Sequence, residues 1–156
     1  MSNGDVTRHK KVLAVASGGG HWVQLMRLRE AFDSCQCAFI SVNEEYADDV
    51  QPAAFFRVPE ANRETKLVLA YAALKILFVI LWFRPDVVVT TGAAHGYLAI
   101  RFSKLVGAKS MFIDSIANAE KLSLSGELAV SHADVMLTQW PDLSDDNSIK
   151  YQGSIL

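Results

Sequence analysis

The feature that most constrains the fold is a series of short segments in which apolar residues run on continuously instead of alternating with polar ones. Such segments occupy residues 11–17, 37–42, 86–92, 109–114 and 134–139, and a shorter one lies at 55–58. Runs of this kind are typical of strands that are covered by helices on both faces of a parallel sheet. Helices are expected between them at residues 21–33, 62–83, 96–105 and 126–131. We therefore predict a single α/β domain with a Rossmann-like, doubly wound parallel sheet.

Length and charge narrow the class of protein. The chain has 156 residues, which is enough for one domain with a substantial core. Its 15 Lys and Arg residues against 17 Asp and Glu residues give a net charge of −2, so we expect no nucleic-acid partner. The polar start has no pattern of a signal peptide, and we expect a flexible N-terminus at 1–10, a domain at 11–156 and a cytoplasmic location. Cys35 and Cys37 are predicted to be free thiols.

The segment from Ser17 through Gly18, Gly19 and Gly20 falls between the first predicted strand and the first predicted helix. Backbone N–H groups at the start of a helix carry partial positive charge, and glycines allow a ligand to approach them closely. The segment is therefore a candidate anion-binding loop. Its spacing fits neither a dinucleotide fingerprint, which would need a glycine at Val23, nor a P-loop. A tight turn without a ligand is the alternative.

Two histidines adjoin glycine turns. His21 follows the first one, at a helix start that favours the neutral imidazole, so it is a candidate general base or else a capping or packing residue. The second turn follows the strand at 86–92 and contains Thr91, Gly92 and His95. Because ligands of such sheets bind outside the carboxyl ends of the strands, we expect these three residues to face the same crevice as His21.

A third polar turn follows the strand predicted at 109–114. Asp114 and Ser115 stand at its end, before a loop of small polar residues. Asp114 is a second candidate base, with a helix N-cap as the alternative.

The segment 67–83 is apolar nearly all round, and its only charged residue is Lys75. As a helix it would be about 26 Å long at ~1.5 Å per residue, slightly short of the roughly 20 residues that span a bilayer. A crossover helix needs only one apolar face. We predict a helix lying partly in the membrane surface, and the alternative is a helix that packs internally or on a partner. The side chains expected to meet the membrane are Leu77, Phe78, Leu81, Trp82 and Phe83.

Four motifs in this order, "VASGGGHWVQLMRL", "RPDVVVTTGAAHGYLAI", "DSIANAEKLSLSG" and "ADVMLTQWPDL…YQGSIL", resemble the bacterial PssD-type proteins of exopolysaccharide synthesis. These proteins are similar to the membrane-anchoring subunit of the eukaryotic N-acetylglucosaminyltransferase that makes dolichol-linked chitobiose. The resemblance covers the chain from about Val12 onward. It implies the amino-terminal half of a GT-B glycosyltransferase such as MurG, with the other half on a separate polypeptide.

The resemblance implies an acceptor-binding and membrane-anchoring role, with a polyprenyl-diphosphate-linked sugar as acceptor and a partner chain that brings the UDP-sugar. It places the three glycines of the first turn near the acceptor diphosphate and makes His21 the first candidate for the base. Many relatives carry Glu-Ser where this chain has Asp114 and Ser115, so the carboxylate side chain of this chain is shorter by one methylene. The resemblance also implies no metal and no cofactor, and a partner-docking tail at 151–156. The residues expected to meet the partner are Trp140, Tyr151, Gly153, Ile155 and Leu156.

The predicted function is thus a subunit of an inverting, UDP-sugar-dependent glycosyltransferase at the cytoplasmic face of the inner membrane, active only with its partner. One alternative is a non-catalytic scaffold that recruits a complete partner enzyme. Another is a small Rossmann oxidoreductase in which Glu44 or Glu45 would bind a ribose.

Overall fold

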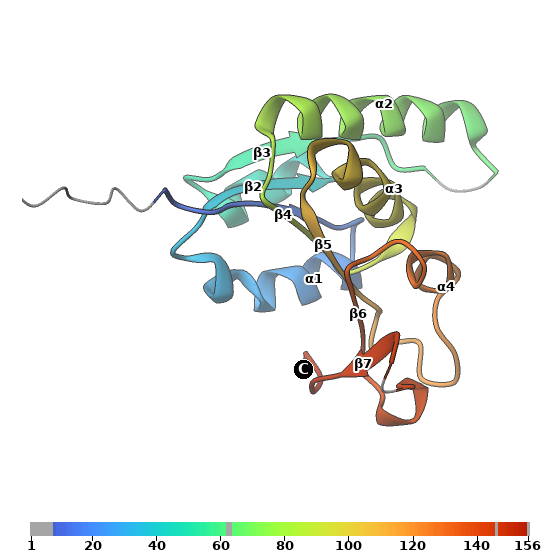
Figure 1. The fold of residues 1–156 in the computed structure, drawn as a ribbon. Helices are drawn as coiled ribbons and strands as arrows, with labels where there is room; N and C mark the ends of the chain where they lie inside the picture. Colours follow the sequence, from blue (N-terminus) through green and yellow to red (C-terminus); the bar gives the residue numbers. More distant parts are fainter. Residues whose placement is uncertain (1–7, 62–63, 146, 156) are drawn as a thin grey trace, which may run out of the picture.

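The computed structural model describes residues 8–61, 64–145 and 147–155. Within them, seven parallel strands form one sheet in the order β3-β2-β1-β4-β5-β6-β7 (Figure 1). The strands are β1 (Lys11–Val15), β2 (Gln36–Ser41), β3 (Ala54–Arg57), β4 (Val87–Thr90), β5 (Lys109–Ile113), β6 (Val135–Thr138) and β7 (Ile149–Tyr151). The predicted doubly wound α/β fold is confirmed. Strand β7 was not expected, because its three residues at the sheet edge are too few to give an apolar pattern.

Helices cover both faces of the sheet, with α2 and α3 on one face and α1 on the other (Figure 1). The α-helices are α1 (Gly20–Arg27), α2 (Lys66–Phe83), α3 (Ala93–Ser103) and α4 (Leu124–Ala129). Short 3-10 helices are η1 (Arg29–Phe32), η2 (Glu44–Val50), η3 (Lys104–Val106) and η4 (Pro141–Leu143). Several boundaries differ from the prediction. Helix α1 ends at Arg27 and η1 follows it, α2 begins at Lys66, α3 begins at Ala93 instead of 96, and α4 lies two residues earlier than expected. Residues 62–63, where the long helix was expected to begin, lie outside the described residues.

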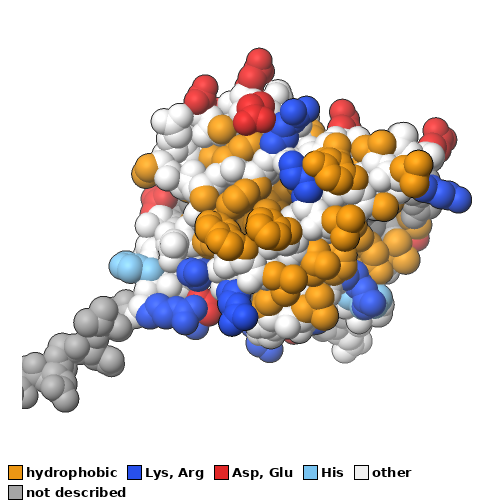
Figure 2. All heavy atoms as spheres, turned by 90° about the horizontal axis from the view of Figure 1, so that it is seen from above, with side chains coloured by type: hydrophobic (Ala, Val, Ile, Leu, Met, Phe, Trp, Pro, Cys, Tyr) orange, Lys and Arg blue, Asp and Glu red, His pale blue; other side chains and the backbone are white. Residues whose placement is uncertain are grey.

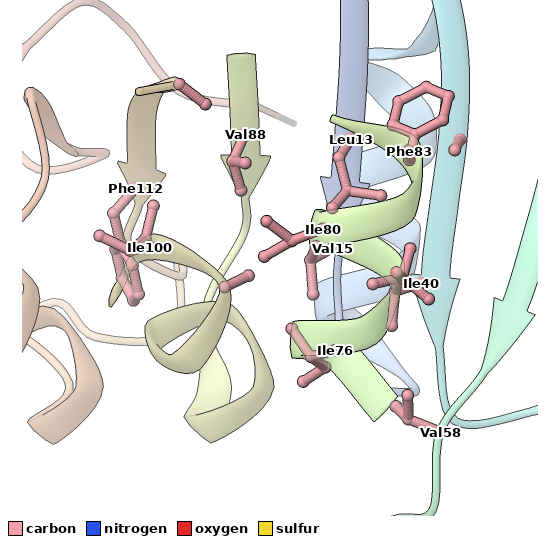
Figure 3. Close-up of a cluster of buried hydrophobic side chains, with 14 of the residues drawn as sticks. Leu13, Val15, Ile40, Val58, Ile76, Ile80, Phe83, Val88, Ile100 and Phe112 are labelled. Atoms are coloured by element: carbon pink, nitrogen blue, oxygen red, sulfur yellow. The ribbon is translucent and has the colours of Figure 1, made fainter. Parts of the chain in front are cut away.

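The core lies on both sides of the sheet because successive strand side chains point to opposite faces. Leu13 and Val15 of β1 face α2 and α3, and Val12 and Ala14 belong to the clusters on the α1 side. Figure 3 shows Ile76, Ile80 and Phe83 of α2 packed over these strands. Burying a side chain of this size contributes about 1.5–3 kcal/mol. This stripe therefore fixes α2 firmly to the sheet.

The outer side of α2 is apolar as well. Leu67, Phe78 and Trp82 are 87%, 67% and 63% exposed. Viewed from above, hydrophobic side chains cover much of this face of the molecule (Figure 2). Contrary to the prediction, Phe83 is not part of this surface, because its side chain is only 5% exposed and lies in the core. Its carbonyl accepts a 2.8 Å hydrogen bond from Lys11 Nζ.

The strand order changes direction between β1 and β4, which are neighbours in the sheet but not in the sequence. At such a point the loops after two adjacent strands diverge to opposite faces and leave a crevice at the carboxyl edge. The first glycine turn follows β1 and the second follows β4. The topology therefore brings the two turns together.

Candidate functional site

The first glycine turn is open. Gly19 has a φ of 64° and is the N-cap residue of α1, so no N-cap side chain occupies this helix start. A Cβ atom added at Gly19 or Gly20 would meet nothing within 4 Å. The start of α1 thus offers backbone N–H groups and free space in front of them, which is the arrangement that favours an anion.

Tyr46, on η2, forms the wall of this turn. Its Oη accepts a 3.1 Å hydrogen bond from the Gly19 N–H, and a Cβ at Gly18 would lie 3.6 Å from the same oxygen. The Tyr46 ring stacks on Trp22 with 4.6 Å between ring centroids, and Trp22 Nε1 donates to Asp49 at 2.8 Å. Tyr46 was not predicted as a site residue, since a tyrosine within an acidic segment gives no signal of its contact with a loop 27 residues earlier.

His21 lies at the junction of the two turns and is held from the second. Its Nδ1 is 2.8 Å from the carbonyl oxygen of Thr91, and Thr91 Oγ1 donates to the His21 carbonyl at 2.7 Å. Gly92, with a φ of 124°, allows the imidazole to lie against the backbone, because a Cβ there would be 2.9 Å from His21 Cε1. The second turn therefore holds the His21 ring in place.

This contact determines which nitrogen of His21 can act as a base. A carbonyl oxygen only accepts hydrogen bonds, so Nδ1 must carry the proton in the bonded state. In the neutral ring the lone pair is then on Nε2. The half-buried His21 side chain thus has one nitrogen fixed by the protein and the other able to take a proton.

Contrary to the prediction, the second turn does not line an open crevice. Thr91, Gly92 and His95 are all buried. His95 is 1% exposed, and its Nε2 lies 2.9 Å from the Pro59 carbonyl, while its Nδ1 has no hydrogen-bond partner among the described residues. Burial lowers the pKa of His95, only partly opposed by the bond to Pro59 and by Glu60. The structure gives His95 a packing role, because its side chain is buried on α3 and its Nε2 is bonded to the Pro59 carbonyl.

Asp114 and Ser115 are also buried, at 1% and 8% exposure. The Asp114 carboxylate accepts hydrogen bonds from the Ser123 N–H at 2.7 Å and from Asn118 Nδ2 at 3.3 Å. These bonds shape the loop that leads into α4, where Ser123 is the N-cap. The geometry does not support the expected role of Asp114 as a base, because both oxygens are engaged beneath that loop. The role is closer to the capping alternative.

Ser115 belongs to a buried polar network that the sequence analysis missed. Gln24 of α1 donates to Ser115 Oγ at 3.2 Å and to the Gly20 carbonyl at 3.3 Å, and its Oε1 accepts from Gln139 at 2.5 Å. Gln139 Oε1 in turn accepts a 2.7 Å bond from the Ile155 N–H. The available signal was a glutamine within the apolar face of a helix, since Gln24 lies between Trp22 and Leu25.

The predicted partner-docking tail folds back onto the domain. The Ile155 carbonyl accepts a 3.2 Å bond from Arg27, and Trp140 Nε1 donates to the Ile116 carbonyl at 2.8 Å. Tyr151, on edge strand β7, and Gly153 are exposed. Leu156 lies outside the described residues. Among the residues that are described, no group of three His, Cys, Asp or Glu side chains is placed to hold a metal ion.

Residues 12–155 match the family described as "Oligosaccharide biosynthesis protein Alg14 like". The chain belongs to the Alg14-like family. It is 29% identical over 168 residues to the Schizosaccharomyces pombe "UDP-N-acetylglucosamine transferase subunit alg14", covering 86% of this chain and 78% of that protein. It is 24% identical to the corresponding subunit of Eremothecium gossypii, covering 86% of this chain and 75% of that one. The expected similarity to the membrane-anchoring subunit of the eukaryotic N-acetylglucosaminyltransferase is confirmed at the level of the family.

Solved structures give the fold of this Alg14-like chain. Acinetobacter baumannii MurG superposes with a TM-score of 0.74 at 13% identity, over 92% of this chain and 45% of MurG. Rickettsia bellii UDP-N-acetylglucosamine 2-epimerase superposes with a TM-score of 0.72 at 15% identity, over 95% of this chain and 46% of the epimerase. The Alg14-like chain spans about half of each structure. Its fold matches the amino-terminal half of GT-B glycosyltransferases such as MurG, as predicted.

Proposed function

We propose that this chain is the acceptor-binding, membrane-attached subunit of a two-chain, UDP-sugar-dependent inverting glycosyltransferase. The acceptor is a polyprenyl-diphosphate-linked saccharide of exopolysaccharide biosynthesis. The observation that carries the proposal is that the chain has the fold of half a GT-B enzyme, while its relatives are named as subunits of a transferase. A second chain would supply the half that binds the UDP-sugar.

The proposed reaction is a single displacement. The acceptor hydroxyl oxygen forms a bond to the anomeric carbon of the donor sugar, the bond to UDP breaks, and His21 Nε2 takes the hydroxyl proton. The Thr91 carbonyl holds Nδ1–H and stabilises the imidazolium that forms. The acceptor diphosphate lies in the open space before α1 and is received by the backbone N–H groups of the first turn of this helix, which begins at Gly20.

Membrane attachment is proposed to use the outer side of α2. Within the described residues, this helix is long and apolar enough to cross a membrane by length and composition. Its inner stripe, however, is part of the core of the domain, so lipid cannot surround it. A helix with one side on a protein core and the other side apolar fits a position in the plane of the bilayer surface. We place it at the cytoplasmic face of the inner membrane.

Docking of the donor-binding chain is proposed to use the exposed tail residues Tyr151 and Gly153. Tyr151 ends the edge strand β7 and Gly153 follows it, and Ile155 is bonded to Gln139 and Arg27. A partner would therefore meet a segment whose shape is fixed by the domain.

The experiment is glycosyl transfer by this chain co-purified with its donor-binding partner, comparing His21→Ala with the control His9→Ala, which changes an exposed histidine near Ser34. Loss of a general base is expected to lower kcat by about 10²- to 10⁴-fold in His21→Ala only, with partner assembly unchanged. Unchanged turnover in an assembled His21→Ala complex would favour the non-catalytic scaffold.

Membrane attachment through α2 is tested separately, by flotation with vesicles. Leu77, Phe78 and Leu81 changed together to Ser should abolish flotation of the complex. The matched control changes three exposed leucines away from α2, namely Leu105, Leu124 and Leu128. Equal flotation of the two triple variants would contradict the role of α2.

A further inference from the structure

A groove of about 540 Å³ lies between α2 and the edge strand β3. Phe55 and Phe56 line it from the strand, and Leu74 and Phe78 line it from the helix. Leu74 and Phe78 are 65% and 67% exposed, so the groove is continuous with the apolar surface of α2 that Figure 2 shows. Its walls can therefore bury a hydrocarbon chain.

The groove also carries charge. Arg57 and Lys75 are among its lining residues, with Glu44 as the carboxylate of the set. Lys75 is the single charged residue between 67 and 83, and it lies in the groove wall 5.8 Å from the centroid of the Tyr71 ring. Apolar walls with two cations beside them complement an amphiphile that has a hydrocarbon chain and an anionic head.

One end of the groove adjoins the first glycine turn. Arg57 Nε donates to the Val42 carbonyl at 3.3 Å, and Val42 Cγ2 lies 3.3 Å from the position of a Cβ at Gly18. Glu44, at the same end, starts η2, which also carries Tyr46 and its hydrogen bond to Gly19. Arg57 thus stands between the apolar groove and the turn that offers N–H groups to an anion.

We propose that this groove binds the first isoprene units of the acceptor lipid, with Arg57 and Lys75 beside its diphosphate and the saccharide directed toward His21. The inference rests on the proposed function, since it names where the acceptor chain of that reaction lies. The occupant is an isoprenoid and not a bulk phospholipid chain because the groove leads to the glycine turn, where the covalently attached headgroup would lie.

The test is photolabelling of the full chain in detergent with a benzophenone derivative of farnesyl diphosphate, mapped by mass spectrometry. Label is expected on Tyr71, Leu74 or Phe78. Leu74→Ser is expected to weaken labelling about tenfold. The control Leu105→Ser changes an equally exposed leucine outside the groove and outside α2, and it is expected to leave labelling unchanged.

A second matched pair tests the charge. Arg57→Gln is expected to weaken labelling about tenfold, because it removes the cation nearest the diphosphate, and Arg101→Gln on the surface of α3 is the control. Unlabelled farnesyl diphosphate should compete with the probe, and dioleoyl phosphatidic acid should not. Equal competition by phosphatidic acid would overturn the isoprenoid assignment. Equal labelling of Leu74→Ser and Leu105→Ser would overturn the groove itself.

Glycosyl transfer separates the two proposals. If Leu74→Ser and Arg57→Gln label like the unmodified chain while His21→Ala abolishes turnover, the groove is wrong and the proposed function stands. If the groove variants lose the label while His21→Ala retains full turnover, the lipid site stands and the catalytic role fails.

Discussion

The two glycine turns look alike in the sequence and lie at the same edge of the sheet, yet they differ in the space around them. At Gly19 and Gly20 an added Cβ would meet no atom within 4 Å. At Gly92 it would lie 2.9 Å from the His21 ring, and at Gly96, on the first turn of α3, it would lie 2.0 Å from Thr90 Oγ1. The first turn leaves room for a ligand, and the second leaves room only for neighbouring residues.

The difference shows that a glycine can be required by close packing or by access, and that only the surroundings tell which. In this molecule the packed turn holds the candidate base and the open turn faces solvent beside it. Alanine in the first turn should therefore act mainly on ligand binding. Alanine in the second turn should act on stability and, at Gly92, also on the position of the His21 ring.

The largest effect on stability is expected for Gly96→Ala. Its Cβ would overlap Thr90 Oγ1 between β4 and α3, and relief requires moving a buried strand or helix. We expect a loss of about 3 kcal/mol in the free energy of unfolding, measured by urea denaturation. Adding Thr90→Ala removes the overlapping oxygen and should restore part of the loss. An unchanged unfolding midpoint in Gly96→Ala would show that this turn is not closely packed.

Gly92→Ala should lower turnover of the assembled enzyme about 100-fold, because the new Cβ displaces the His21 ring from the Thr91 carbonyl. The control is Gly107→Ala, which also places alanine at a positive φ, here 70° in the left-handed helical region, but meets nothing within 4 Å. Both variants should lose stability, and only Gly92→Ala should lose activity. Equal activity in the two variants would show that activity does not depend on the second turn holding the His21 ring in place.

Low pH should destabilise the folded chain through His95 in the second turn. Burial lowers the pKa of this histidine in the folded state, so below the ordinary histidine pKa of about 6.5 the unfolded chain binds a proton that the folded chain does not. The free energy of unfolding should then fall with decreasing pH, by at most about 1.4 kcal/mol per pH unit from this group. In His95→Gln, which keeps a donor for the Pro59 carbonyl, that part of the slope between pH 6.5 and 5 should vanish. His9→Gln, at an exposed histidine, should leave the slope unchanged.

The smallest effect on stability is expected for Gly20→Ala in the open turn. Alanine at this helical position should change the free energy of unfolding by less than about 1 kcal/mol, in the stabilising direction. The KM for the lipid-linked acceptor should nevertheless rise, because the methyl group takes space in front of the helix start. An unchanged KM would mean that no ligand approaches Gly20.

Much of the fold could be predicted because parallel strands that are buried on both faces form continuous apolar runs, which can be recognised in a single sequence. Six of the seven strands in the described residues fall on segments singled out by their continuous apolar character. The strand β7 escaped because an edge strand of three residues, two of them exposed, buries too little to be apolar. The early end of α1 has a similar cause, since nothing in the residues after Arg27 marks the change to a 3-10 helix.

The site was predictable in position but not in detail. Topology places Gly19, His21, Thr91 and Asp114 at one edge of the sheet, and the sequence analysis identified them there. A polar side chain that faces solvent and one that turns inward look alike in a sequence. The crevice position expected for His95 and the base role, one of two expected for Asp114, do not fit their burial. That distinction depends on partners distant in the sequence, such as Ser123 for Asp114 and Pro59 for His95.

The tail from Tyr151 to Ile155 has a consequence for association. Fixing the backbone of a free segment costs roughly 1–2 kcal/mol per residue in conformational entropy. Here Ser154 Oγ bonds to the Gln139 carbonyl at 3.0 Å, and the Ile155 N–H and carbonyl are bonded to Gln139 and Arg27. Folding of this chain alone has already ordered the segment. A second chain that docks there would not have to order the tail, so a larger share of its contact energy would remain as affinity than with a free segment.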